Sequence, residues 1–300
     1  MLRSAVIGGI VMIAAMCCAG APSLRAQGCS DAGICTMGNM RAGAVVTAQQ
    51  RSLHTSLSGS VGIGEQGVTI LHVVPEVSLP LFEHGTLRAS IPLVRASGSL
   101  GTNEGLGDAS INYSHSLYRH DAVEMGLTAG VRIATGTTNA ERSVGKALPM
   151  PYQTGLGTTD LVVGASAIID QWTLAAGYQR VVVDRNSNAY HDEGLGYFTS
   201  HQLRRGDDAM LRVSRRFEVG GVDLAPSVLA IYRVQGDRVM NLNVEGSSGL
   251  TLNVALAAMT PISERFNLRL DLASPLVVRK VRADGLTRAC VATLELSYRL

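Results

Sequence analysis

The sequence predicts an all-β protein, an antiparallel up-and-down transmembrane β-barrel of about 12 strands, within a range of about 10 to 14. Three observations predict it: period-two alternation of apolar and polar residues, connections that alternate between short and long, and an alternating run at the end of the printed sequence. In that run, from Val291 to Leu300, one face carries Ala292, Leu294, Leu296, Tyr298 and Leu300. A strand with one apolar face must place it against lipid or a core.

Residues 1–26 have the layout of a secretory signal peptide. A basic residue precedes an apolar run from Ala5 to Ala19, and small or turn-forming residues lead to an expected cleavage site near Ala26. The apolar run is shorter than the roughly 20 residues that a membrane helix needs. We therefore expect export and a location in the bacterial outer membrane, with lipidation at Cys17 or Cys18 as the alternative for this segment.

Residues 27–52 are expected to form a short periplasmic segment before the barrel. Cys29 and Cys35 lie close together in an oxidising compartment, which favours a small disulfide loop over a metal site that would need more ligands nearby. Cys290 is left over and is expected to pack as a small hydrophobe. So short a segment leaves no room for a plug domain.

Residues 53–300 are predicted to form the barrel, because each alternating run in this part is apolar on one face and polar on the other. In order, the predicted strands are residues 53–63, 71–81, 87–93, 111–117, 123–133, 158–169, 172–183, 208–217, 222–235, 249–260, 265–275 and 287–300. The last strand is expected to pair with the weak first strand and so close the barrel.

The connections support a barrel that has short turns at one end and long loops at the other. The predicted short turns are residues 83–85, 119–121, 170–171, 218–221 and 261–264. The predicted long loops are residues 98–106, 136–157, 184–207, 236–248 and 276–286, and the first outer connection, 64–67, is tight. In an outer-membrane barrel the short turns face the periplasm, so both termini are expected there, which requires an even number of strands.

Glycine and aspartate recur where several strands begin after a long loop. The examples are Gly107-Asp108, Gly157 to Asp160 and Gly206-Asp207-Asp208. Turn chemistry at a strand start is enough to explain this repeat. Calcium binding by these carboxylates is the alternative that the pattern leaves open.

A soluble β-sandwich is the main structural alternative, because period two alone does not distinguish a lipid-facing surface from a packed core. Export, the final strand and the alternating connections favour the barrel. The aromatic content of 4% is low for a barrel with two aromatic girdles. The candidate girdle residues all lie near the short turns: Phe82, Tyr118, Trp172, Phe217, Phe266 and Tyr298.

Two short segments carry a resemblance to a known family. They run from Asn103 to Tyr113, with the letters NEGLGDASINY, and from Leu156 to Leu161, with the letters LGTTDL. These segments resemble outer-membrane barrel proteins associated with the meta-cleavage pathway of phenol degradation, which are related in architecture to hydrophobic-compound transporters. The resemblance implies uptake of small molecules, including apolar ones. The chain lacks the longer N-terminal hatch of long-chain fatty-acid transporters.

If the apolar faces point outward, the polar faces line the lumen. The charged residues expected there are Glu76, Arg88, Glu124, Arg132, Arg212, Arg216, Arg233, Arg269, Asp271 and Glu295. Such a mixture can form buried ion pairs that close a narrow lumen, or it can line a small aqueous path. The excess of arginine would favour anions in an open path.

Other function classes receive less support. The net charge of +2 does not point to nucleic acid, and no residue pattern requires a cofactor or a metal. An outer-membrane lipid hydrolase would need a serine beside a histidine, but Ser114, His115 and Ser116 alternate between the two faces of one strand. A structural or surface-binding barrel that displays its loops is the alternative to a small-solute channel. Expected partners are outer-membrane lipid, an unknown small solute, and the barrel-assembly machinery acting on the strand from Val291 to Leu300.

Overall fold

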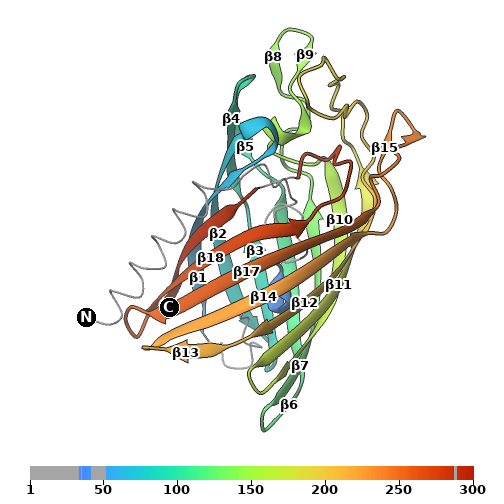
Figure 1. The fold of residues 1–300 in the computed structure, drawn as a ribbon. Coiled ribbons are helices and arrows are strands. Elements are labelled where there is room, and N and C mark those ends of the chain that lie inside the picture. Colours follow the sequence, from blue (N-terminus) through green and yellow to red (C-terminus); the bar gives the residue numbers. More distant parts are fainter. Residues whose placement is uncertain (1–33, 35, 42–51, 287–288) are drawn as a thin grey trace.

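The computed structural model describes residues 34, 36–41, 52–286 and 289–300. The predicted signal peptide and the predicted Cys29 to Cys35 disulfide lie outside the described residues. Figure 1 shows tilted strands that carry long loops at one end and short turns at the other. We call these the loop end and the turn end. Among the described residues, no helix has the length and apolar character needed to cross a bilayer.

The strands form one closed antiparallel barrel with 12 strand positions, as predicted. Two of the positions are interrupted, because β3 and β4 together occupy one and β5 and β6 the next. The barrel strands are β1 (His54–Ile63), β2 (Thr69–Leu81), β3 (Gly85–Ser90), β4 (Leu93–Gly98), β5 (Gly101–Leu106), β6 (Ala109–His120), β7 (Val123–Ile133), β10 (Thr158–Ile169), β11 (Trp172–Asp184), β12 (Asp208–Arg215), β14 (Val222–Arg233), β17 (Gly249–Pro261), β18 (Phe266–Val277) and β19 (Val291–Arg299). A short strand, β13 (Phe217–Val219), extends the β12 position at the turn end.

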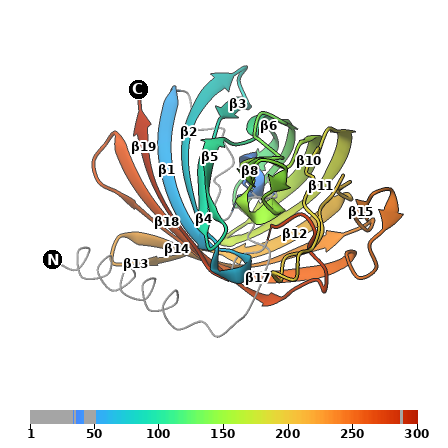
Figure 2. The same ribbon diagram turned by 90° about the horizontal axis from the view of Figure 1, so that it is seen from above.

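The last strand closes the barrel on the first, as the sequence predicted. β1 pairs with β2 on one side and with β19 on the other, so that Leu57 lies opposite both Pro75 and Leu296. Figure 2, which looks down on the loop end, shows β19, β1 and β2 side by side in the wall. All neighbouring strands are antiparallel, which gives the up-and-down order.

The predicted long loop at 98–106 is wrong. This region is a hairpin in which β4 and β5 pair along their whole length and turn at Ser99 and Leu100. β5 contains two glycines, three polar residues and only one apolar residue, so it shows no apolar alternation and its sequence resembles a loop. The interruption between β3 and β4 falls at Ile91 and Pro92, where proline has no N–H to donate to the sheet.

The short turns are built from residues that tolerate left-handed backbone conformations. Asp121 and Asp170 adopt φ angles of 50° and 58° in the β6–β7 and β10–β11 turns. Aspartate is common at such positions in tight hairpins. These turns therefore fix the register of the hairpins at the turn end.

The outer face of the barrel is apolar. Exposed leucines and valines recur on every second residue of the strands, as at Leu57, Leu127 and Leu161. Five of the six aromatic residues predicted near the short turns are exposed at that end, and the half-buried Tyr298 lies 4.8 Å from Phe266 between ring centroids. An apolar band bordered by aromatic rings is the outer surface of a barrel that contacts lipid.

The loops pack on one another over the loop end. They contain β8 (Glu141–Ser143), β9 (Lys146–Ala147), β15 (Arg238–Val239), β16 (Leu242–Asn243) and the short helix η3 (Met150–Tyr152). The tight first outer connection contains the short helix η2 (Glu65–Gly67). Tyr152, Tyr190 and Tyr197 are buried within the loops, and the hydroxyls of Tyr152 and Tyr197 are 3.2 Å apart. These tyrosines therefore pack the loops together and are not exposed on the loop surface.

Candidate functional site

The part of the N-terminal segment that the structure describes lies inside the barrel. The short helix η1 (Gly38–Met40) contacts β6, β7, β10 and β11, and its blue ribbon is visible within the barrel in Figures 1 and 2. We expected residues 27–52 to lie in the periplasm before the barrel, but Ile34 and residues 36–41 lie in the lumen. We call residues 36–41 the strap. The segment was predicted from its length, which does not reveal where it folds.

Glycines in the wall make room for the strap. A Cβ atom on Gly164 of β10 or Gly177 of β11 would meet the sulfur of Met40, whose side chain is fully buried. Gly38 adopts a φ of 51° and packs against Ser114 and Thr128 so closely that a side chain would collide with them. The wall of β6, β7, β10 and β11 is therefore shaped to hold the strap.

Polar contacts hold the far end of the strap across the lumen. Arg212 Nη1 on β12 donates a hydrogen bond of 2.6 Å to the carbonyl oxygen of Met40. Arg41 forms ion pairs with Glu295 on β19 and, at 3.6 Å, with Asp271 on β18. The strap thus reaches from the β10–β11 wall to the opposite wall and narrows the lumen.

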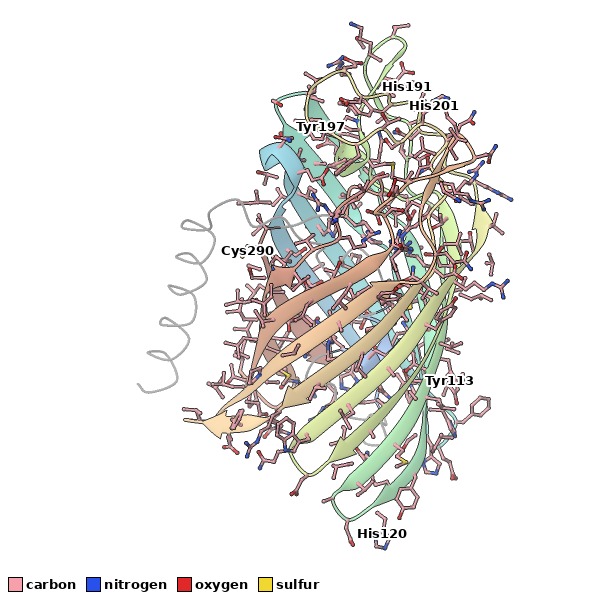
Figure 3. All side chains as sticks on the ribbon, turned by 45° about the vertical axis from the view of Figure 1, so that its right-hand side comes forward. Tyr113, His120, His191, Tyr197, His201 and Cys290 are labelled. Carbon is pink, nitrogen blue, oxygen red and sulfur yellow. The ribbon has the colours of Figure 1, made fainter. Side chains whose placement is uncertain are left out.

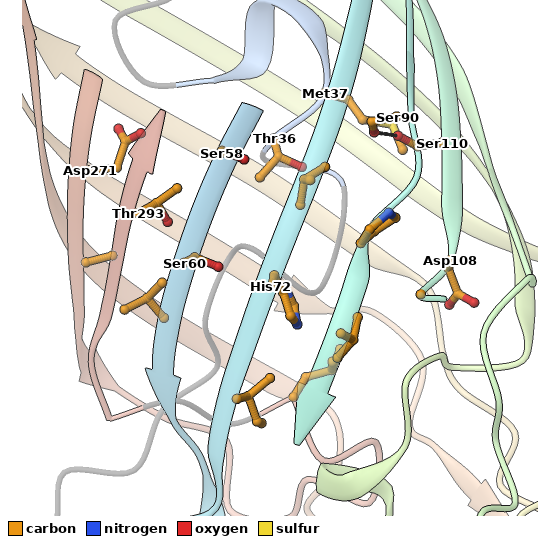
Figure 4. Close-up of a pocket in the computed structure, with 18 of the residues that line it drawn as sticks. Thr36, Met37, Ser58, Ser60, His72, Ser90, Asp108, Ser110, Asp271 and Thr293 are labelled. Carbon is orange, nitrogen blue, oxygen red and sulfur yellow. Dashed lines mark hydrogen bonds between the residues drawn. The ribbon is translucent and has the colours of Figure 1, made fainter. Parts of the chain in front are cut away.

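A cavity of about 270 Å³ lies between the strap, the inward-folded loops and the wall formed by β18, β19, β1 and β2. Its size is close to the lower limit of ordinary ligand pockets, about 300 Å³. Figure 4 shows Ser58 and Ser60 of β1 beside His72 of β2 and Thr293 of β19. Across the cavity the hydroxyls of Ser90 and Ser110 are 2.9 Å apart. This wall therefore offers hydroxyl groups to a solute.

The two ends of the cavity differ in chemistry. Toward the loop end, the lining includes Ile70, Val94, Met150, Leu156 and Leu286, which we call the apolar end. Along β2, Ile70 is followed two residues at a time toward the turn end by His72, Val74 and Glu76, because alternate strand residues share a face. Polarity therefore increases from the loop end to the turn end.

Seven charged side chains gather toward the turn end of the cavity, and we call them the charged end. They are Arg41, Arg88, Arg212, Arg269, Glu76, Asp271 and Glu295. Arg269 makes two parallel hydrogen bonds of 2.7 and 2.6 Å to the carboxylate of Asp271. Paired guanidinium and carboxylate groups of this kind are rigid and strongly polar.

A second group of charges fills the lumen near the loop end on the opposite wall. We call this group the buried network, and its members are Arg132, Arg205, Arg233, Arg279, Asp160, Asp208, Asp237 and Asp284. Their side chains are at most 5% exposed. Four positive and four negative groups balance one another. The network therefore closes its part of the lumen instead of forming a water-filled path.

Arg233 is the centre of the buried network. Its guanidinium contacts Asp208 at 2.6 Å, Asp284 at 2.8 Å and also Asp237. Arg279 contacts Asp284 at 3.0 Å. Because Asp237 and Asp284 belong to two different loops and Arg233 belongs to β14, these contacts fasten both loops to the barrel wall.

The two loop carboxylates have different protonation behaviour. Burial raises the pKa of Asp237, and the nearby negative charge of Asp284 raises it further. Together these two effects outweigh the guanidiniums of Arg233 and Arg279, which lower it. Burial also opposes ionisation of Asp284, but Arg279, Arg233 and Arg205 lower its pKa well below the usual range. Asp284 therefore carries the firm negative charge of the pair.

The ten charged residues that the sequence assigned to the lumen lie in different parts of the barrel. Those that line the cavity are Glu76, Arg132, Arg212, Arg269, Asp271 and Glu295. Arg88 faces the lumen next to the cavity, and Arg233 belongs to the buried network. Glu124 pairs with Arg119 near the turn end. Arg216 is 54% exposed and pairs with Asp223 at the same end, away from the cavity.

Sequence reasoning missed most of the buried network. Asp160 and Asp208 did give a signal, because both belong to the repeated glycine and aspartate at strand starts. Asp108, another member of the repeat, also fastens a loop, because it accepts hydrogen bonds from the backbone N–H groups of Gly136 at 3.1 Å and Leu156 at 2.9 Å. In the part of the chain that the structure describes, no cluster of three potential metal ligands occurs.

The histidines lie in separate parts of the molecule, and those of the loops, His191 and His201, stack with their ring centroids 4.4 Å apart. Figure 3 shows His191 and His201 in the loops and His120 at the turn end. Tyr113 and His115 share a hydrogen bond of 3.0 Å, whereas Ser114 and Ser116 are buried on the other face of β6. Cys290 is buried. This geometry brings no histidine of β6 together with a serine on the same face.

Comparison with known proteins shows that this chain is similar to outer-membrane barrels in fold. No family model matches the chain, and no curated protein matches its sequence. An outer membrane channel from Pseudomonas putida F1 is similar in structure, with a TM-score of 0.61 and 15% identity over 83% of this chain and 95% of that one. The NanC porin has a TM-score of 0.50 and 7% identity over 83% of this chain and 100% of its own. The resemblance to outer-membrane barrels of the channel type is thus confirmed for the fold.

Proposed function

We propose that this protein is a bacterial outer-membrane channel for small solutes. The observation that carries the proposal is a closed barrel with an apolar outer face and an internal cavity lined by hydroxyls and charges. An apolar exterior is stable only in lipid, and a polar interior that holds space serves a solute. The likeness in fold to an outer membrane channel supports the same function.

The solute path in this proposal runs along the wall of β19, β1 and β2. The buried network fills the loop end on the opposite side, and the strap packs against β10 and β11. Ser56, Ser58 and Ser60 supply a row of hydroxyls from the turn end to the cavity. These groups exchange hydrogen bonds with a moving solute at little cost, because each can donate or accept.

The finer proposal is that the solutes include compounds with an apolar part. The apolar end of the cavity supports it, since Ile70, Val94 and Leu286 offer no hydrogen bonds to a fully polar solute. A hydrocarbon group placed there would be removed from water. This agrees with the hydrophobic-compound transport that the sequence motifs imply.

Location and assembly belong to the same proposal. We infer that residues 1–26 direct export, that the barrel then enters outer-membrane lipid, and that the strand Val291–Arg299 presents its alternating face to the barrel-assembly machinery. No catalytic role is proposed, because the β6 histidine and its neighbouring serines lie on opposite faces of the strand.

Liposome swelling tests the channel directly. Folded protein, identified by its heat-dependent migration on a gel, is placed in liposomes and challenged with neutral solutes of increasing size. We expect swelling that is fast for the smallest solutes and falls off with size. Swelling no faster than in protein-free liposomes would instead support a non-conducting structural or surface-binding barrel, the reading that the buried network favours.

A further inference from the structure

Counted over the residues that the structure describes, the charged end of the cavity carries one more positive group than negative groups. It contains four guanidiniums, those of Arg41, Arg88, Arg212 and Arg269, and three carboxylates, those of Glu76, Asp271 and Glu295. The other charged residues of the cavity lining are accounted for elsewhere. Arg132 and Asp284 belong to the buried network, and Asp108 accepts hydrogen bonds from backbone amides. The surplus positive charge therefore belongs to the charged end itself.

Arg88 forms no ion pair with a carboxylate of the described residues. Asp271 and Glu295 are both bound by arginines other than Arg88. Among the described residues no carboxylate lies within ion-pair distance of Arg88, and its Nε atom is buried without a hydrogen-bond partner. Glu76 on β2 is its nearest negative neighbour along the sheet, placed diagonally because Arg88 pairs with Ser78 and Glu76 pairs with Ser90.

The neighbours of Arg88 can complete a site for an anion. Ser90, two residues along β3, and Asn112, directly opposite Arg88 on β6, both line the cavity. A hydroxyl and an amide can each donate a hydrogen bond to a carboxylate oxygen. A guanidinium removed from water without a counter-charge is unfavourable, and an incoming anion relieves this cost.

The opposite end of the cavity selects for an apolar group. Ile70, Val94, Met150, Leu156 and Leu286 lie toward the loops, and the whole cavity measures about 270 Å³. This volume suits a single ring or a short chain. A molecule that filled both ends would need an apolar body and one negative head.

We infer that the cavity binds a small amphipathic anion, a carboxylate with a single ring or a short hydrocarbon chain, with its negative head at Arg88. This inference rests on the proposed channel and names its substrate class. A cation of the same shape is repelled by the surplus positive charge of the charged end. A neutral analogue leaves Arg88 without a counter-charge.

Binding to the full-length folded protein in detergent tests the inference without any need for conduction. The probes are 4-fluorobenzoate, 4-fluorobenzyl alcohol and 4-fluorobenzylamine, and the readout is the fluorine NMR signal during titration. We expect the benzoate to bind about tenfold more tightly than the alcohol, the change expected from one charge-assisted hydrogen bond. The amine should bind most weakly. Equal binding of the three probes would overturn the inference.

Variants locate the negative head. Arg88→Gln should reduce benzoate binding to the level of the alcohol and leave alcohol binding unchanged. Arg95→Gln is the matched control, because Arg95 is exposed and pairs with Glu104 away from the charged end. Ser90→Asp should also abolish the preference by supplying Arg88 with a carboxylate. Retention of the benzoate preference in both lumen variants would refute the assigned site.

The two proposals fail in different ways. A benzoate preference in detergent combined with no swelling of liposomes would remove the channel and leave the binding site. Swelling combined with no preference among the three probes would leave the channel and remove the substrate class. Heat-dependent migration of each variant shows that it is folded before either measurement is made.

Discussion

The two walls of the lumen use the same residue types for opposite purposes. On the side of β10, β12 and β14, arginines and aspartates are paired in a dry network that joins loops to the barrel. On the side of β1, β2 and β19, charges border a cavity, and Arg88 on the neighbouring β3 forms no ion pair with any carboxylate that the structure describes. Pairing and burial therefore decide whether a charged lumen residue stabilises the fold or meets a solute.

The difference arises from the loops. Arg205, Asp237, Arg279 and Asp284 come from loops and descend onto the strand residues of the buried network. The seven members of the charged end come from strands and from the strap, and no loop residue within the described ranges joins them. The network side is thus closed from above, while the cavity side keeps its space.

Arg233→Gln should have the largest effect, because it breaks the centre of the buried network. The substitution leaves Asp208, Asp237 and Asp284 with less compensation for their buried charge. We expect the free energy of unfolding to fall by about 3 to 5 kcal/mol. Urea unfolding in lipid vesicles measures it, and a change below about 0.5 kcal/mol would show that the network does not stabilise the fold.

Two substitutions in the loops should differ in their effect on stability. Asp284 has a lowered pKa in the folded protein, so it contributes to the free energy of unfolding at pH values above the usual aspartate pKa of about 3.9. This contribution is lost as the pH falls through the lower folded pKa. Asp237 has a raised pKa in the folded protein, so its contribution to the free energy of unfolding is present at pH values below the usual aspartate pKa. This contribution is lost as the pH rises through the folded pKa of Asp237. Asp284→Asn should therefore cost more stability at pH 7.5 than Asp237→Asn.

The same pair predicts a pH dependence. Between the usual aspartate pKa and the raised pKa of Asp237, the wild type should lose part of its stability as pH rises, and Asp237→Asn should lose less. Unfolding midpoints of both proteins, measured at several pH values between about 4 and about 7.5, check this prediction. A steeper pH dependence in Asp237→Asn than in the wild type would contradict the assignment.

Gly164→Leu tests the cavity side by displacing the strap. The new side chain would occupy the space of the Met40 sulfur, so the strap should leave the β10–β11 wall. Overpacking of this kind costs about 1 to 3 kcal/mol when the neighbour cannot move. We expect solute flux through liposomes to change severalfold relative to Gly59→Ala, a control glycine with open space around it. Equal flux in the two variants would mean that the strap does not restrict the path.

Arg216→Ala should have the smallest effect. Arg216 pairs with Asp223 at 2.8 Å, but its side chain is 54% exposed at the turn end. Exposed pairs contribute at most about 1 kcal/mol, and salt screens them. A loss of stability as large as that of Arg233→Gln would show that burial does not separate the two kinds of pair.

Much of the fold could be predicted because strand alternation is a local signal. The strand from Val123 to Ile133 and the final strand appear where the sequence placed them. β5 escaped prediction because Leu106 is its only apolar residue, so it shows no alternation. Alternation also indicates which strand residues share a face: Glu76 and Asp271 were predicted to line the lumen, and in the structure both border the cavity.

The partners of inward residues could not be predicted, because loop and strap contacts depend on tertiary structure. Arg41 lies in a segment without alternation, and nothing local indicates that it reaches Glu295. Asp237 and Asp284 are loop carboxylates that resemble solvated surface residues in sequence. Only the packed loops reveal that Arg233 holds both.

Single-channel recording in planar bilayers tests the central claim most directly. The claim is that the space beside β1 and β2 conducts while the buried network stays closed. Folded wild-type protein should give discrete conductance steps, and Gly164→Leu should change their size while Gly59→Ala should not. A flat trace from folded wild-type protein and from both variants would contradict the account.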